Sequence, residues 1–207
     1  MNSFYPSNRQ PLPPSAFAFL PLGAVKPIGW LKDQLRIQAD GQSGNLPKFW
    51  ESLSPNSGWR GGTGEGWERG PYFLDGYLPM AYLLDDEDLQ KEAQQWIEYA
   101  LNSQDAFGHF GPRASSIDWW PFAIILKVLT QYHEVSGDER VIPLMQKFFK
   151  YMKNEMPTNH WYSWAWVRWA DMVLSIKWLY NRTGEKWLLE LADKIHRHTA
   201  KWSDGVP

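Results

Sequence analysis

The chain has 207 residues, a net charge of -2 at pH 7 and no cysteine, so disulfides, thiolate nucleophiles and cysteine-ligated zinc are excluded within it. It lacks the basic patches of nucleic-acid-binding or membrane-surface proteins. No apolar stretch approaches the roughly 20 residues of a membrane span, and the N-terminus lacks a signal-peptide pattern. We therefore expect neither a nucleic-acid nor a membrane partner, and a cytoplasmic location.

The first part of the chain is expected to contain an arm, one helix and a long loop. Residues 1–22 show no periodic pattern and contain several prolines, which predicts an extended arm. A helix is expected to begin near Lys26-Pro27, because proline is favoured in a first turn, and to stop at Gly41. Residues 42–70 then form a predicted loop, and a loop of this length in a compact domain is usually functional.

The rest of the chain predicts three helical hairpins that repeat about every fifty residues. The first helix of each pair is apolar on most faces and the second is amphipathic, as the inner and outer rings of a toroid require. The expected pairs are 72–84 with 88–101, 119–135 with 141–152, and 164–181 with 187–198. These features predict an all-α fold, an (α/α)6 toroid of which about half is present.

A closed toroid has six hairpins, and residues 23–207 provide only part of it. We therefore interpret residues 23–207 as a partial barrel domain and a fragment. Its open apolar edge is expected to self-associate. The long connections, 41–70, 102–117 and 153–162, all precede inner helices and therefore lie on one face, where we expect the functional site.

The glycine-rich stretch 59–75 is the first candidate for that site. Glycines allow close backbone approach, aromatic faces stack, and carboxylates and arginines bind hydroxyls, a mixture that suits a sugar. Glycoside hydrolysis generally uses two carboxylates. The candidates are the acids Glu65, Glu68 and Asp75, with Trp67 and Arg69 as substrate contacts. The alternative is structural: Glu68 would pair with Arg69 or Arg60, and Asp75 would satisfy local backbone groups.

The starts of the other two predicted inner helices also contain candidate site residues. Asp118 is expected to contact substrate or simply to cap a helix, and of Trp119 and Trp120 one should pack in the core while the other stacks on a sugar. Trp166, Arg168 and Asp171 belong to the start of the third inner helix. Because Arg168 and Asp171 are three residues apart on one helical face, they either line the barrel mouth or form a structural ion pair.

Metal and phosphate sites are not predicted. The five histidines are dispersed along the sequence, and the run Gly61 to Gly64 lacks the lysine and serine or threonine of a phosphate-binding loop.

Several segments resemble glycoside hydrolase family 127, the β-L-arabinofuranosidase-like group, from about Leu20 to the end of the chain. They are PLGAVKPIGWL at 21–31, WERGPY at 67–72, DWWP at 118–121 and LYNRTGE at 179–185. Gly76 and Leu126 stand where such enzymes carry histidines, which marks a divergent branch.

The resemblance implies the N-terminal portion of an (α/α)6 catalytic barrel that cleaves a non-reducing-end sugar from oligosaccharides or plant glycans, with carbohydrate as the partner. It also implies a cysteine nucleophile held on zinc by further cysteines and a glutamate. Because this chain has no cysteine, those ligands and the zinc would lie outside it, and no cofactor is expected within it. Two other functions stay open: an unsaturated uronyl hydrolase, and a non-catalytic helical module that binds glycan or protein.

Overall fold

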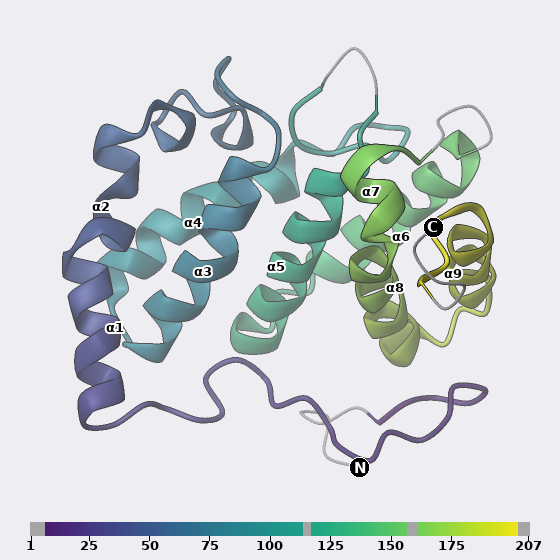
Figure 1. Cartoon of the computed structure of the whole chain (residues 1–207), viewed down its shortest axis with the longest axis horizontal. Helices are drawn as coiled ribbons and strands as arrows, with labels where there is room; N and C mark the ends of the chain where they lie inside the picture. The colour runs from purple at the N-terminus through teal and green to yellow at the C-terminus, as the bar shows by residue number, and fades with distance from the viewer. Residues whose placement is uncertain (1–6, 114–116, 157–160, 203–207) are drawn as a thin grey trace.

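The computed structural model describes residues 7–113, 117–156 and 161–202, and all their regular structure is helical (Figure 1). This confirms the predicted all-α class. The helices are α1 (Trp30–Asp40), α2 (Gln42–Phe49), α3 (Arg69–Leu83), α4 (Glu87–Asn102), α5 (Trp120–Ser136), α6 (Val141–Glu155), α7 (Ser163–Val167), α8 (Trp169–Thr183) and α9 (Trp187–His198), with 3-10 turns η1 (Glu51–Leu53) and η2 (Gly58–Arg60).

Parts of four predictions lie outside the described residues: 1–6 of the arm, 114–116 and 157–160 of the long connections, and the chain end 203–207. Within the described part of the chain, no helix is long and apolar enough to cross a membrane.

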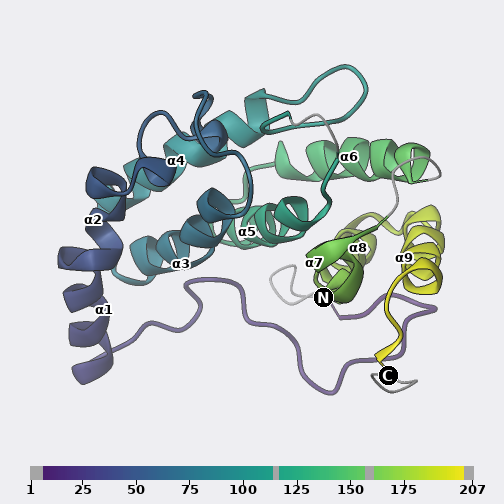
Figure 2. The same cartoon turned by 45° about the horizontal axis from the view of Figure 1, so that its top comes forward.

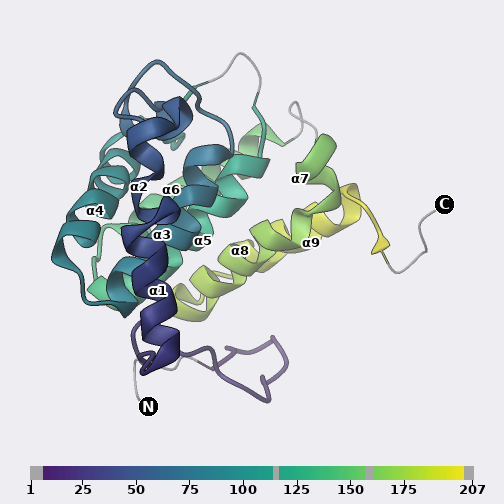
Figure 3. The same cartoon turned by 60° about the vertical axis from the view of Figure 1, so that its left-hand side comes forward.

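The three predicted hairpins are present as α3–α4, α5–α6 and α8–α9. Helices α3, α5 and α8 pack side by side as an inner layer, and α4, α6 and α9 lie behind them (Figures 1 and 2). Helix α5 is central and buried along most of its length because most of its residues are apolar. At the edge of this array, α1 and α2 follow each other beside α3 and α4 (Figure 3).

The predicted turns between the paired helices are confirmed, and each has a left-handed residue. Gly137 and Gly184 end α5 and α8 with φ of 71° and 74°, which glycine adopts without steric conflict. In the first turn Asp85 has φ of 53°. The next residue, Asp86, caps α4 by accepting hydrogen bonds from the backbone N–H groups of Asp88 and Leu89, both at 3.1 Å.

Three predicted boundaries were wrong. Helix α1 begins at Trp30 because Gly29 has a positive φ of 55°. Lys26 therefore lies before the helix, and its side chain contacts the turn between α3 and α4. Residues 42–70 are not one loop, since α2 and both 3-10 turns occupy much of them. The third inner helix is interrupted at Arg168, which separates α7 from α8.

The described part of the N-terminal arm crosses the ends of all three hairpins (Figure 1). Lys26 Nζ lies 2.6 Å from Asp85 Oδ1 at the first turn, and Gly23 packs near Val135 at the end of α5. At the third turn the backbone N–H of Arg9 donates to Asn181 Oδ1 at 3.0 Å. The arm therefore ties together the end of the array opposite the long connections.

Candidate functional site

One face of α3 carries three polar side chains that point toward the neighbouring inner helices. Glu68, Tyr72 and Asp75 are spaced by four and three residues, so they lie on one side of the helix. Glu68 is the N-cap residue of α3, and Tyr72 and Asp75 follow in its first two turns.

Helix α5 meets this face with Trp120, Lys127 and Gln131. The indole Nε1 of Trp120 donates to Glu68 Oε2 at 2.5 Å. Lys127 Nζ lies 2.8 Å from Asp75 Oδ2, and Gln131 Nε2 donates to Asp75 Oδ1 at 3.4 Å. The structural alternatives for both acids were therefore wrong, because Glu68 pairs with neither Arg69 nor Arg60 and Asp75 bonds across to another helix.

Helix α8 completes the arrangement at the break before it. The guanidinium carbon of Arg168 lies 4.9 Å from the Trp120 ring centroid, a cation–π contact. Arg168 Nε also donates to Asp171 Oδ2 at 3.1 Å, so the predicted ion pair is confirmed. About half of the Arg168 side chain is exposed, which leaves it in contact with solvent at the surface of the inner layer.

Tyr72 lies among these charges. Burial raises the pKa of Tyr72, the positive charge of Arg168 lowers it, and the negative charges of Glu68, Asp171 and Asp75 raise it again. Its ring meets the edge of Trp120 at a centroid distance of 6.0 Å. The structure thus brings residues from three inner helices together in what we call the mouth cluster: Glu68, Tyr72, Asp75, Trp120, Lys127, Arg168 and Asp171.

Asp118 lies beside the mouth cluster and organises the start of α5. Its Oδ1 accepts the backbone N–H of Trp120 at 3.0 Å, and its Oδ2 accepts the indole N–H of Trp67 at 2.8 Å. Asp118 therefore satisfies the first turn as predicted, although it precedes the N-cap residue, Trp119, by one position. Trp67 is 40% exposed, so its ring remains available to a ligand.

The side chains of Glu65 and Arg69 contact residues of the segment before α3, outside the mouth cluster. Glu65 Oε1 accepts the backbone N–H of Trp67 at 2.9 Å, and its buried Oε2 has no hydrogen-bond partner among the described residues. Arg69 donates to Ser52 Oγ at 3.1 Å and lies over the Trp50 ring at 5.7 Å. In this structure both residues hold the segment before α3 in place.

The predicted stacking tryptophans occupy three different environments. Trp119 is 1% exposed and stacks on Trp161 in the core, so its face is closed to a sugar. Trp120 is 2% exposed and serves as a hydrogen-bond donor and a platform for Arg168. Trp166 on α7 is 43% exposed, and its role as a sugar contact stays a prediction.

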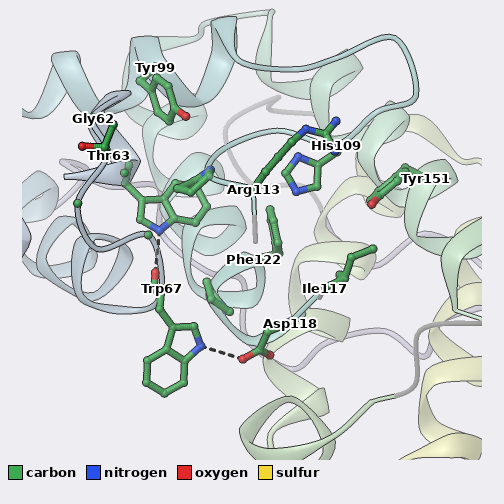
Figure 4. Close-up of a pocket in the computed structure, with 16 residues that line it drawn as sticks. Gly62, Thr63, Trp67, Tyr99, His109, Arg113, Ile117, Asp118, Phe122 and Tyr151 are labelled. Atoms are coloured by element: carbon green, nitrogen blue, oxygen red, sulfur yellow. Dashed lines mark hydrogen bonds between the residues drawn. The ribbon is translucent and has the colours of Figure 1, made fainter. Parts of the chain in front are cut away.

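A cavity of about 480 Å³ lies on the other side of α5, beneath the glycine-rich segment (Figure 4). Trp67 and Asp118, which are joined by a hydrogen bond, form part of its wall. The remaining wall comes from the segment before α3, the end of α4, the connection before α5, the start of α5, and α6. Its side chains include Tyr99, His109, Arg113, Phe122 and Tyr151.

Sequence reasoning missed Tyr72, Lys127 and Gln131, although signals for them exist. Tyr72 lies at helical spacing between two candidate acids, and Lys127 is the only charged residue in the first twelve positions of α5. A lone charge in an otherwise apolar helix requires a partner, and seven residues separate it from Trp120, which places both on one face.

Zinc does not fit the described residues. No group of three or more histidine, aspartate or glutamate side chains among them is placed to hold a metal ion, and the chain has no cysteine.

Comparison with known protein families gives one match, to the model described as beta-L-arabinofuranosidase, GH127 catalytic domain, over residues 31–204. Searches of curated proteins and of solved structures found no match. The matched region includes the described helices α1 to α9, apart from the first residue of α1, and it contains the whole mouth cluster. The long match and the helical hairpins agree, and we conclude that the chain belongs to the glycoside hydrolase family 127 of β-L-arabinofuranosidase-like catalytic domains.

Proposed function

We propose that the mouth cluster binds the non-reducing-end sugar of a glycan whose glycosidic bond is hydrolysed, with a β-L-arabinofuranoside as the first substrate to test. The observation that carries this proposal is the meeting of Glu68 and Asp171 around Trp120 and Tyr72, at the ends of three inner helices. Carboxylates beside aromatic rings are the groups that bind sugar hydroxyls and assist glycoside cleavage.

Glu68 and Asp171 are the two acids in this cluster that keep an oxygen for a ligand. Each has one oxygen engaged, by Trp120 and Arg168 respectively, while no described residue donates to Glu68 Oε1 or Asp171 Oδ1. Asp75 has both oxygens engaged by α5. We therefore assign the substrate contacts to Glu68 and Asp171, and a positioning role to Asp75.

The charge of the mouth cluster favours a neutral sugar. Its three acids outnumber its two cations, and both Lys127 and Arg168 are already paired with aspartates. A uronide would therefore meet surplus negative charge, which repels a carboxylate. The two cations are nevertheless the feature that would suit an unsaturated uronide, so that substrate is the second arm of the test.

The test compares variants in binding and in hydrolysis of 4-nitrophenyl β-L-arabinofuranoside. Glu68→Gln and Asp171→Asn keep the shape of each side chain and remove its charge, and each should lower kcat/KM or sugar affinity by about tenfold or more, since hydrogen bonds to charged groups are the stronger ones. Asp193→Asn on the exposed face of α9 is the matched control and should change neither.

Three results would overturn this assignment. Unchanged turnover and affinity in both mouth variants would remove the mouth cluster from function. Cleavage of a 4,5-unsaturated uronide, seen as loss of ultraviolet absorbance, without cleavage of the arabinofuranoside would establish the uronyl hydrolase alternative. Unchanged sugar affinity in both variants, with neither substrate cleaved by the parent chain, would favour a non-catalytic binding module.

A further inference from the structure

The cavity beneath the glycine-rich segment is separate from the mouth cluster because the two lie on opposite faces of α5. Trp120 and Phe122 are two residues apart, which on an α-helix is a rotation of about 200°. Trp120 contacts Glu68 and Arg168, whereas Phe122 packs against Trp59 and His109. A ligand in the cavity would therefore not share the face of α5 that carries the proposed catalytic acids.

The connection before α5 contains a tight turn that fixes one side chain, His109, in the cavity wall. Asp105 Oδ1 accepts the backbone N–H groups of Phe107, Gly108 and His109 at 2.8, 2.8 and 3.2 Å. Gly108 has φ of 112°, and a Cβ there would lie 2.5 Å from the carbonyl oxygen of Lys147 on α6. The turn is thus locked against α6, and the position of the imidazole is set before any ligand arrives.

The imidazole of His109 is largely buried, and its ring packs between aromatic side chains. It is 6% exposed, and the edges and faces of Phe122 and Tyr151 hold it at centroid distances of 5.4 and 5.7 Å. No described residue hydrogen-bonds either ring nitrogen. Burial lowers the pKa of His109, so the neutral ring presents one donor and one acceptor. His109 lines the cavity, so a ligand there can reach its ring nitrogens.

Two hydroxyl groups face the same cavity from opposite sides. Tyr99 comes from α4 and Tyr151 from α6, with His109 between them (Figure 4). Neither hydroxyl bonds to another residue in the described ranges. Burial raises the pKa of both phenols, so both remain donors as well as acceptors at neutral pH.

The charged groups of the cavity wall already have partners. Arg113 forms an ion pair with Asp105, and Asp118 accepts the Trp67 indole N–H. What remains for a ligand is a set of neutral donors and acceptors with aromatic and apolar walls. The volume of about 480 Å³ falls within the roughly 300–1,000 Å³ of small-molecule sites.

We propose that this cavity is a second, non-catalytic binding site for a neutral saccharide, whose hydroxyl groups bond to His109, Tyr99 and Tyr151. Saccharides combine several neutral hydroxyls with a partly apolar ring, and that combination matches these three side chains and the aromatic and apolar walls around them. The site requires no hydrolysis at the mouth cluster, so it stands or fails independently of the proposed catalytic function.

The test is titration of the full chain with L-arabinose, D-galactose, D-glucose and xylobiose, with glycerol as a polyol control. Calorimetry gives the affinity, and ¹⁵N imidazole NMR reports on His109, whose signal is assigned by its loss in His109→Gln. At least one saccharide should shift that signal, while glycerol should not. The double variant Tyr99→Phe with Tyr151→Phe keeps both rings and removes two hydroxyls, and it should weaken binding at His109 by about tenfold.

Tyr72→Phe is the matched control, because it removes a hydroxyl from the mouth cluster instead. It should leave the titration at His109 within about twofold of the parent chain. The proposal is overturned if no saccharide moves the His109 signal in the folded chain, or if Tyr72→Phe weakens that titration as much as the double variant does. Hydrolysis lost in Glu68→Gln with saccharide still bound at His109 would support the cavity and leave the mouth assignment to its own test.

Discussion

The two faces of α5 both carry aromatic residues, but the surroundings of these residues differ. On the mouth side, Arg168 lies over the Trp120 ring and pairs with Asp171, and Lys127 pairs with Asp75 further along α5; these charges remain partly exposed. On the cavity side, Phe122 is enclosed by Trp59, Phe110, His109 and Phe148. The mouth is therefore organised by electrostatics and hydrogen bonds, and the cavity by packing around a few unpaired polar groups.

The two faces of α5 therefore differ in how much their residues contribute to the stability of the fold. Exposed ion pairs contribute little to folding, typically 0–1 kcal/mol, so the mouth side of α5 can be specialised for a ligand without much effect on the fold. The cavity side of α5 cannot be changed without affecting the fold, because its residues also form the aromatic core that joins the second hairpin to the glycine-rich segment.

Replacing Phe122 tests the packing side and should give the largest effect. Phe122 is 5% exposed and contacts four aromatic rings, so Phe122→Ala should lower the free energy of unfolding by about 3–5 kcal/mol. Lys127→Ala on the opposite face, with a side chain 53% exposed, should lower it by less than about 1 kcal/mol. Urea denaturation measures both, and similar losses for the two variants would contradict the comparison.

The sequence predicts the hairpins well because their signals are local. Apolar periodicity, an acidic first turn and a glycine at the end of a helix lie within one turn of the residues that they affect, and α9 was predicted with its exact bounds. The start of α1 was predicted too early because Pro27 favours a first helical turn, whereas Gly29 adopts a backbone conformation that keeps the helix from starting before Trp30. The sequence alone does not say which of these two residues determines the start.

The site was predicted less completely because its contacts join different hairpins. Asp118, Glu68 and Asp171 could be proposed from motifs, but the hydrogen bond between Glu68 and Trp120 spans 52 positions. Periodicity places a residue on a face and does not say which helix meets that face. His109 was regarded as isolated because the chain shows no neighbouring histidine, and only the fold brings Tyr99 and Tyr151 beside it.

Gly108 offers an intermediate test of the cavity side, because it positions His109 without lining the cavity. Gly108→Ala forces a Cβ into the Lys147 carbonyl at a backbone φ of 112°, so it should lower stability by about 1–3 kcal/mol and weaken saccharide binding at His109. Gly137→Ala is the matched control: its φ is 71° and nothing lies within 4 Å of the added Cβ, so only the left-handed strain of about 1–2 kcal/mol applies.

Thermal denaturation and the His109 titration together show whether a loss of saccharide binding comes from displacement of the His109 imidazole or from general destabilisation. Loss of saccharide binding in Gly108→Ala but not in Gly137→Ala would show that the turn positions the imidazole. Equal effects of the two variants on binding would mean that general destabilisation, and not the position of His109, controls the cavity.

The smallest expected effect is the pH dependence that His109 adds to stability. Burial lowers the pKa of His109 in the folded chain below its ordinary value near 6.5, so in that range the unfolded chain binds more protons. Its contribution is therefore fully present above about pH 6.5 and is lost as the pH falls toward the folded pKa.

Denaturation of the parent chain and of His109→Gln at several pH values between about 7.5 and 5 isolates this contribution, since Arg113, Asp105 and Tyr151 around the ring stay the same in both. The stability of the parent chain should fall more steeply on acidification than that of the variant. Parallel pH profiles would show that the imidazole of the folded chain takes up its proton as readily as that of the unfolded chain, as it would if the cavity were filled with solvent that stabilises the charge. The distinction between a solvated mouth and a desolvated cavity on the two faces of α5 would then be wrong.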